Sequence, residues 1–301
     1  MRETLVLLLM AVTAGCATAV DSSRELRQIA DEVWSRELEG NLSARMRLGL
    51  PIETMPDPSY ENAAADAASA RRVLERLERI DPRSLSEDER LTLGVLRWRQ
   101  QLAVDGLPHF WHQFPVTPYN SRVREANEAL AQFTFRGGAD AQRYVRLLAG
   151  YARFIDALTA VVTEQRRRGI LIPQPELPLV RGMFGGLLQE GDASPFALAG
   201  GRLSALSGEE RAALMEGVRQ AIERQINPAL RRLLNVLSSD YESAAPRAVG
   251  LAHQPGGSDA YRFLMRLHTS LDLTPEEVHR LGLAEIDRIE HELDGIRREL
   301  G

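Results

Sequence analysis

Apolar residues recur every three or four positions along most of this chain, which is the spacing of one face of an α-helix. The clearest case follows Asp140, where an apolar stripe continues until three arginines precede Gly169. Its members are Tyr144, Leu147, Leu148, Tyr151, Phe154, Ile155, Leu158 and Val162. We predict a long amphipathic helix that is capped by Asp140 and ends at the arginines, whose charge suits the carbonyl end of a helix. Strand patterns are scarce, so the fold is predicted to be all-α.

Several helix starts are marked by capping residues. In a capping box, a hydroxyl and a carboxylate three residues apart each accept a hydrogen bond from the backbone N–H of the other residue. Such pairs are Ser86 with Glu89, Ser207 with Glu210, and Thr274 with Glu277. Further helices are expected from Ser22 and from Ser59, the second ending before Asp81-Pro82. The sequence therefore predicts a multi-helix array of amphipathic helices joined by long Pro- and Gly-rich loops.

Two connections and one proline interrupt this pattern. Residues 108–120 are rich in aromatic residues and proline, and we expect a packed loop there. Residues 170–196 join two helices, and a connection of that length usually has local structure or a function. In the helix that starts at Ser207, Pro228 is expected either to kink the helix or, together with Asn227, to separate two helices.

The last predicted helix begins at Thr274 and carries apolar residues as far as Leu300, next to the end of the sequence. An apolar stripe must be covered by another element. The stripe is consistent with an interrupted protein, and equally with a helix that packs back on earlier helices. If half of a domain is missing, apolar helix faces should be exposed in patches larger than those of typical monomers. We expect residues 22–301 to be the N-terminal portion of a single α-helical domain.

Composition excludes some functions. The chain has 301 residues, 44% of them hydrophobic, which is enough for a sizeable core. A formal net charge of -5 indicates no nucleic-acid partner. All basic residues are arginine, which we attribute to nucleotide composition, and without lysine neither a Schiff base nor a lysine general base is available.

The N-terminus resembles a targeting segment. Arg2 precedes an apolar run that is too short to span a bilayer, and small residues follow it directly before Cys16, the one cysteine. We predict a signal segment over residues 1–15, lipid attachment at Cys16 and a tether over residues 16–21, with ordinary cleavage near Ala19 as the alternative. The protein would then be exported to the periplasm or cell envelope and would contact the membrane through its lipid anchor.

Residues able to carry chemistry are scattered. The six histidines are His109, His112, His253, His268, His279 and His291, and no His-Glu-x-x-His motif for zinc occurs. His109 and His112 lie between prolines and aromatic residues, which favours a structural role. Glu276 and His279 have the Glu-x-x-His spacing of di-iron bundles, but those sites need two copies. We predict no catalytic residue, no metal ligand and no cofactor in this chain.

The last 46 residues of the chain before Gly301 resemble a signature block of a bacterial family, the domain of unknown function 885. The block reads PGGSDAYRFLMRLHTSLDLTPEEVHRLGLAEIDRIEHELDGIRREL. The resemblance is carried by Gly257, Tyr261, Thr269, Leu273 to His279, Gly282-Leu283, Glu285, Arg288 and Ile289. Three earlier segments are also similar to the family, namely RLGLP, LERIDPRSLSEDERL and DAQRYVRLLAGYARFIDALTAVVTEQRRRGILIP.

This resemblance implies a helical zinc peptidase of the gluzincin type that acts on peptides. The zinc motif expected for the family, His-Glu-x-x-Pro-Gly-His-His, would lie beyond the signature block, and no position here matches it. The chain is therefore interpreted as the N-terminal half of an exported zinc-metallopeptidase-like hydrolase, inactive alone, with Tyr261 and His268 as candidate substrate-side groups. The alternatives are a complete, non-catalytic helical lipoprotein that acts as a binding or scaffold module, and a bundle that acquires a metal by dimerising.

Overall fold

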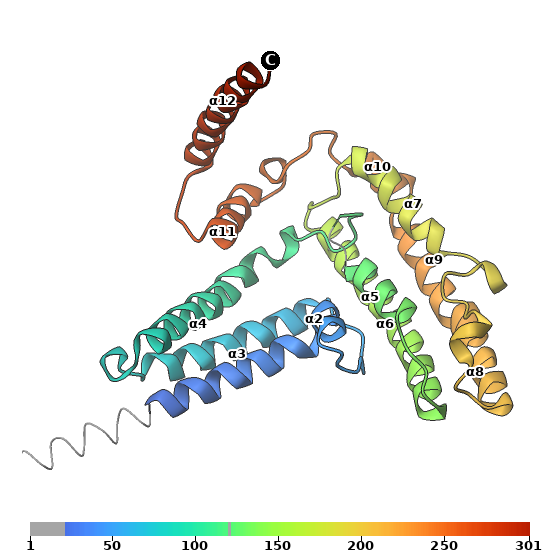
Figure 1. The fold of residues 1–301 in the computed structure, drawn as a ribbon. Coiled ribbons are helices and arrows are strands. Elements are labelled where there is room, and N and C mark those ends of the chain that lie inside the picture. Colours follow the sequence, from blue (N-terminus) through green and yellow to red (C-terminus); the bar gives the residue numbers. More distant parts are fainter. Residues whose placement is uncertain (1–21, 120–121) are drawn as a thin grey trace, which may run out of the picture. The chain divides into compact units, whose positions relative to one another are not determined.

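A computed structural model describes residues 22–119 and 122–301 of the protein. Every regular element in these two ranges is a helix, so the predicted all-α class is confirmed (Figure 1). The described residues up to Val249 form one compact unit, and Gly250–Gly301 form a second. Among the described helices, none is both long and apolar enough to cross a bilayer.

The first unit begins with a layer of long helices. A helix over residues 22–39 lies beside α3 (Tyr60–Glu78) and α4 (Glu87–Gly106) (Figure 1). A 3₁₀ turn, η1 (Pro82–Ser84), connects α3 to α4. The small core of this layer contains Leu26, Ile29, Leu77, Ile80, Leu85, Leu93 and Leu96. Ser59 caps α3 and Ser86 with Glu89 forms the capping box of α4, as predicted.

The aromatic segment after α4 is more regular than predicted. Instead of an irregular loop, residues Leu107–His112 form the 3₁₀ helix η2, which Pro108 opens at its first turn. Tyr60 of α3 stacks on Trp111, with ring centroids 5.3 Å apart and planes 15° apart. The side chain of Gln165, which is buried, donates hydrogen bonds to the carbonyls of Trp111 (2.7 Å) and Gln113 (2.9 Å). These contacts fix η2 between the first helical layer and the second.

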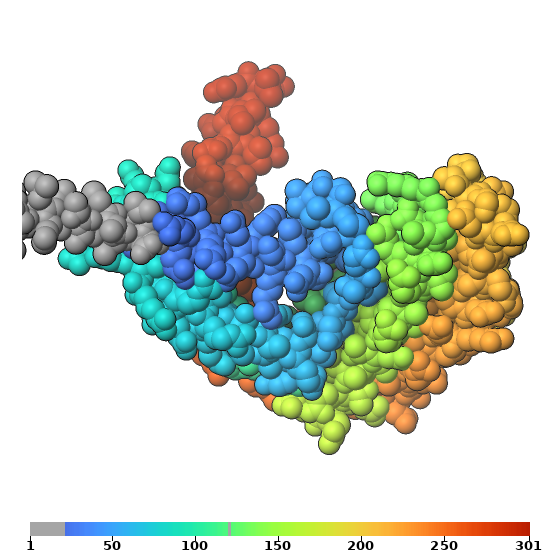
Figure 2. All heavy atoms as spheres, turned by 90° about the horizontal axis from the view of Figure 1, so that it is seen from below, coloured from blue at the N-terminus to red at the C-terminus, as the bar shows by residue number. Residues whose placement is uncertain are grey.

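The second layer is built around α6 (Gly138–Arg167), which packs against α5 (Arg122–Ala131), α8 (Gly208–Ala221) and α9 (Asn227–Val236). All eight residues of the predicted α6 stripe are buried in the main hydrophobic core. The short helix α2 (Leu42–Arg47) packs on α5, and Figure 2 shows this blue segment beside the green one.

Asp140 does not cap α6, which corrects the predicted start. The cap residue is Gly137, and Asp140 lies in the first helical turn. There its carboxylate accepts a hydrogen bond from the backbone N–H of Arg136 (2.9 Å) and pairs with Arg143. A carboxylate in the first turn is stabilised by the positive end of the helix dipole. Asp140 therefore does mark the start of α6, but the helix begins one turn earlier than predicted.

The connection over residues 170–196 contains a helix that its composition concealed. α7 (Leu177–Leu187) holds a proline and three glycines, yet Leu177, Val180 and Phe184 are buried in the core. Short 3₁₀ turns flank it, namely η3 (Gln174–Glu176), η4 (Gly191–Ala193) and η5 (Gly200–Leu203). Tertiary burial of one apolar face therefore overrides the low helix propensity of this segment.

Pro228 changes the type of helix without ending the helical run. The π turn Ile222–Ile226 immediately precedes α9, in which Pro228 occupies the first turn. A proline inside a helix has no N–H for the preceding turn and clashes with the carbonyl four residues back, and a wider π turn accommodates both effects. Asn227 is buried there and donates a hydrogen bond to the carbonyl of Gln189 (3.0 Å). α10 (Ser239–Ala244) ends this layer.

The second unit consists of η7 (Leu251–His253), α11 (Gly257–Thr269) and α12 (Pro275–Leu300). Thr274 and Glu277 form the predicted capping box at the start of α12. None of the residues of α12 is buried.

Candidate functional site

The turn that leads into α11 depends on two glycines. Gly256 has φ 71°, a left-handed conformation that favours glycine. A Cβ on Gly257 would lie 1.6 Å from the carbonyl oxygen of Leu251, which leaves no space for any side chain. The N–H of Gly257 donates to the carbonyl of Gln254 (2.9 Å), and the N–H of Gln254 donates to the Leu251 carbonyl (2.9 Å). The glycine pair of the signature block thus folds η7 tightly against the start of α11.

The two candidate substrate-side residues share one face of α11. Tyr261 and His268 are seven residues apart, which is two helical turns or about 10 Å along the axis. Both side chains are exposed. Ser270 ends the helix with φ 56°, and the Thr269 hydroxyl donates to the carbonyl of Met265 (2.7 Å). The structure therefore aligns Tyr261 and His268 on a rigid element.

The histidines are not gathered into a metal centre by the described part of the chain. His109 and His112 lie in η2 with ring centroids 6.4 Å apart, in the aromatic cluster around Trp111. No group of three or more histidine, cysteine, aspartate or glutamate side chains within residues 22–119 and 122–301 could hold a metal ion. Cys16 and the predicted signal segment lie outside the described residues.

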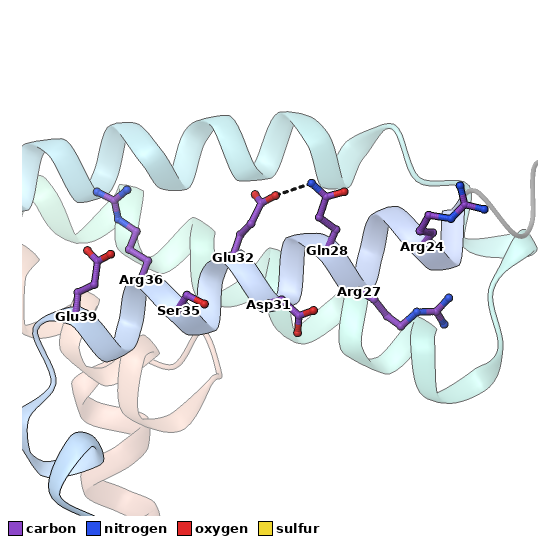
Figure 3. A pocket seen from close by; sticks show the side chains of 8 residues that line it. All are labelled: Arg24, Arg27, Gln28, Asp31, Glu32, Ser35, Arg36 and Glu39. Atoms are coloured by element: carbon purple, nitrogen blue, oxygen red, sulfur yellow. Dashed lines mark hydrogen bonds between the residues drawn. The ribbon is translucent and has the colours of Figure 1, made fainter. Parts of the chain in front are cut away.

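A shallow depression of about 700 Å³ lies along the helix over residues 22–39. Figure 3 shows its polar lining, in which Arg27 pairs with Glu89 of α4 at 3.3 Å and two further side chains pair with α3. Arg36 pairs with Asp66 of α3 at 3.0 Å, and Glu32 pairs with Arg76 of α3. Glu32 has a lowered pKa because its carboxylate accepts a hydrogen bond from Arg76 and a second from Gln28. Because positive and negative groups alternate along this surface, it favours neither an anion nor a cation.

The arginines at the end of α6 contact aromatic rings, which the sequence did not reveal. The guanidinium of Arg168 lies over the Trp111 ring at 4.4 Å from its centroid, and that of Arg166 lies 5.8 Å from the Tyr241 centroid. Burial raises the pKa of Tyr241, whose hydroxyl accepts a hydrogen bond from the N–H of Ile172 (2.9 Å). These arginines therefore connect α6 to η2 and α10, in addition to suiting the helix end.

The signature turn and α11–α12 belong to a longer matching region. A protein-family model, "Bacterial protein of unknown function (DUF885)", matches residues 43–301. The chain belongs to the DUF885 family. That match includes the whole second unit and the first unit from residue 43, so it extends well beyond the signature block.

Among the solved structures that share the fold of this DUF885 protein is "the putative lipoprotein from Colwellia psychrerythraea", with a TM-score of 0.71 and 18% sequence identity. The alignment covers 90% of this chain and 49% of the Colwellia chain, so this chain spans about half the length of that structural neighbour. A search of curated proteins finds no match.

Proposed function

We propose that this DUF885 chain is the N-terminal helical half of an exported zinc-metallopeptidase-like hydrolase and that it is inactive alone. In this proposal its helices form one wall of a site for peptide substrates. The zinc ligands and the general base belong to a further polypeptide segment, in which the family motif is His-Glu-x-x-Pro-Gly-His-His.

One observation carries the proposal. The family model matches residues 43–301. The structural alignment covers 90% of this chain but only 49% of the structural neighbour. A fold of that size has room for as many residues again, and α12 has an exposed apolar face on which they could pack. Activation of water by zinc needs three protein ligands around one ion, and in this proposal the further segment supplies them.

Tyr261 and His268 are the residues of this chain that we propose for contact with the substrate. A phenol and an imidazole can each donate or accept a hydrogen bond to a peptide backbone. Both project from a helix whose start is fixed by the Gly257 turn. In an assembled enzyme, Tyr261→Phe and His268→Gln should raise KM with little change in zinc content, and loss of zinc would contradict a substrate-side role.

We propose export and a lipid anchor at Cys16 from the N-terminal sequence. The name of the Colwellia protein, which includes the word lipoprotein, supports this part of the proposal. Metabolic labelling with a fatty acid should mark the wild-type protein and leave Cys16→Ala unlabelled. If the wild type is secreted without label, cleavage near Ala19 is the correct reading of the segment.

The main test uses the purified chain with zinc and a fluorogenic peptide library. We expect no stoichiometric zinc and no chelator-sensitive cleavage from the chain alone. Co-expression with the C-terminal half of a longer DUF885 protein should restore zinc binding and cleavage. Zinc-dependent cleavage by the chain alone would refute the proposal. The DNA downstream of codon 301 offers a faster check, because the zinc motif in any frame there supports it.

The second candidate function is a non-catalytic helical lipoprotein that binds or scaffolds another protein. It is favoured by the main core around α6, which is one continuous cluster of buried hydrophobic residues. This reading predicts a monomer that unfolds sharply and binds no hydrophobic dye. Dye binding that disappears when polar residues replace the apolar residues of α12 would instead favour the first proposal.

A further inference from the structure

The C-terminal half of α12 carries an apolar stripe with the spacing of a two-helix seam. Apolar residues alternate at intervals of three and four over two heptads, and all of them are exposed. They are Ile286, Ile289, Leu293, Ile296 and Leu300. A strict period of 3.5 residues produces a narrow apolar stripe, which is typical of a helix that packs against one partner helix. A helix that packs on a globular core has a wider apolar face.

The edges of this seam carry an uneven charge. Glu285, Glu292 and Glu299 follow one edge at intervals of seven residues, while the other edge has Glu290 and Arg297. Glu285 and Glu292 also pair with Arg288 of the same helix, which offsets part of the negative charge of the first edge. Over its whole length α12 has eight carboxylates and four arginines, although the 301-residue chain has a net charge of only -5. Residues at the edges of a helix pair face the partner helix and determine which partners are accepted.

A second copy of α12 is a poor partner for this seam. In an antiparallel pair, equivalent edges face each other, which sets the row of Glu285, Glu292 and Glu299 against itself. In a parallel pair, Glu285 faces the partner's Glu290, and only Glu292 meets Arg297. Like charges at such positions destabilise a pair by about as much as opposite charges stabilise it. Charge complementarity therefore favours a different helix with basic residues along its edge.

We propose that the α12 seam is a docking surface for an amphipathic helix whose edge carries arginine or lysine. We assign that helix to the part of the DUF885 fold that lies outside the matched half of the structural neighbour, and in this respect the inference rests on the proposed function. The apolar seam supplies the affinity, and the acidic edge excludes self-pairing and selects the partner.

The experiment measures binding of two synthetic probes to the purified chain by fluorescence anisotropy. Both probes copy residues 275–300, and the basic-edge probe has arginine in place of Glu285, Glu292 and Glu299. At low salt we expect the basic-edge probe to bind about tenfold more tightly than the unaltered probe, which corresponds to three edge pairs. The difference should shrink in 0.5 M salt, where exposed charges are screened.

Two chain variants locate the binding site. Ile289→Ser removes a seam residue and should weaken basic-edge probe binding by about tenfold or more. His291→Ser lies on the opposite face of α12 and should leave binding unchanged. Equal binding of the two probes, no binding at 100 µM, equal effects of the two variants, or sedimentation of the chain as a dimer that Ile289→Ser abolishes would each overturn the docking proposal. These outcomes test docking alone. The proposed function fails by a different result, which is zinc-dependent peptide cleavage by the chain alone.

Discussion

Arg181 is the single side chain whose loss should most disturb the turn between α9 and α10. Its Nε donates to the carbonyl of Leu237 (2.6 Å) and its Nη2 donates to the carbonyl of Ser238 (2.8 Å). Its Nη1 donates to the carboxylate of Glu242 in α10 (2.6 Å). Leu237 is the C-cap of α9, where helix carbonyls have no partner within the helix, and Ser238 is the N-cap of α10. One guanidinium from α7 therefore binds the junction of the two helices, although the Ser238 carbonyl also accepts a hydrogen bond from the N–H of Glu242 (3.1 Å).

The expected loss of stability on replacing Arg181 can be estimated from these three hydrogen bonds. Each bond to a carbonyl contributes about 1 kcal/mol net, and more where the acceptor is left without a partner. The Arg181 side chain is 29% exposed and that of Glu242 is 45% exposed, so their ion pair is screened. It adds at most about 0.5 kcal/mol. Arg181→Met should therefore lower the free energy of unfolding by about 2–3 kcal/mol. Arg181→Lys keeps the charge but not the planar fork, and should cost about 1–2 kcal/mol.

Urea denaturation, monitored by circular dichroism, measures the decrease in the free energy of unfolding. Faster hydrogen exchange of the α10 amides would show that the destabilised region is the turn before α10. Arg231→Met is the matched control, because Arg231 makes one exposed ion pair with Glu190 (3.2 Å). We expect the control to change stability by less than about 0.5 kcal/mol. If Arg181→Lys behaves as wild type, or if Arg181→Met is no worse than the control, the guanidinium does not hold the turn.

Three further variants test other parts of the structure. Gly257→Ala places a Cβ 1.6 Å from the carbonyl oxygen of Leu251, so we expect fast hydrogen exchange over residues 251–261. Glu210→Gln tests the capping box of α8, where a hydrogen bond from the Ser207 backbone lowers the pKa of Glu210 from its usual 4.5. Because a lowered pKa adds stability above 4.5 that is lost as pH falls through the folded value, the variant should depend less on pH in urea titrations between pH 5 and 3. Leu148→Ala, at a fully buried position of α6, should cost about 2–5 kcal/mol in urea denaturation.

Each of these variants has a matched control. Gly282→Ala adds a methyl group within α12 where no atom lies within 4 Å, so exchange should not increase. Glu209→Gln changes a neighbouring carboxylate outside the capping box and should keep the wild-type pH dependence. Leu91→Ala removes a side chain that is 69% exposed and should be nearly neutral. A variant that matches its control in the corresponding assay would refute the structural reason given for that site.

Local features of the fold were predictable from sequence because their causes lie within one or two helical turns. The capping boxes at Ser86, Ser207 and Thr274 each need only residues three apart, and all three occur in the structure. The α6 stripe needs only a repeated spacing. The start of α6 was misplaced because both Gly137 and Asp140 suit a helix start, and only the observed backbone distinguishes the cap from the first turn.

Contacts between distant segments could not be predicted. The carbonyls bound by Arg181 lie 56 and 57 residues later in the chain. Arg202 binds the carbonyls of Leu130 (3.0 Å) and Phe133 (2.8 Å), which lie 72 and 69 residues earlier. No sequence pattern links such partners. Arg181 donates to its two carbonyls from two nitrogens of its planar guanidinium, an arrangement that lysine cannot reproduce.

The sequence named Tyr261 and His268 as candidate residues through the family resemblance, without predicting the helix that carries them. The structure places both on α11. The glycine pair before them was visible in the sequence. Only the structure shows why residue 257 must be glycine, because a Cβ there would lie 1.6 Å from the carbonyl oxygen of Leu251. What Tyr261 and His268 face depends on segments that sequence spacing does not describe.

Helix geometry shows that the two histidines of α12 cannot bind one zinc ion together. His279 and His291 both lie on α12, and twelve residues of helix separate them by about 18 Å along the axis. Ligands of one zinc ion must each lie about 2 Å from it, so these two histidines cannot share an ion. His268 belongs to α11, and no group of ligands forms anywhere in the described ranges. Under the proposed function, this chain would contribute the substrate-side wall and the α12 seam, and a second helical segment would contribute the zinc ligands.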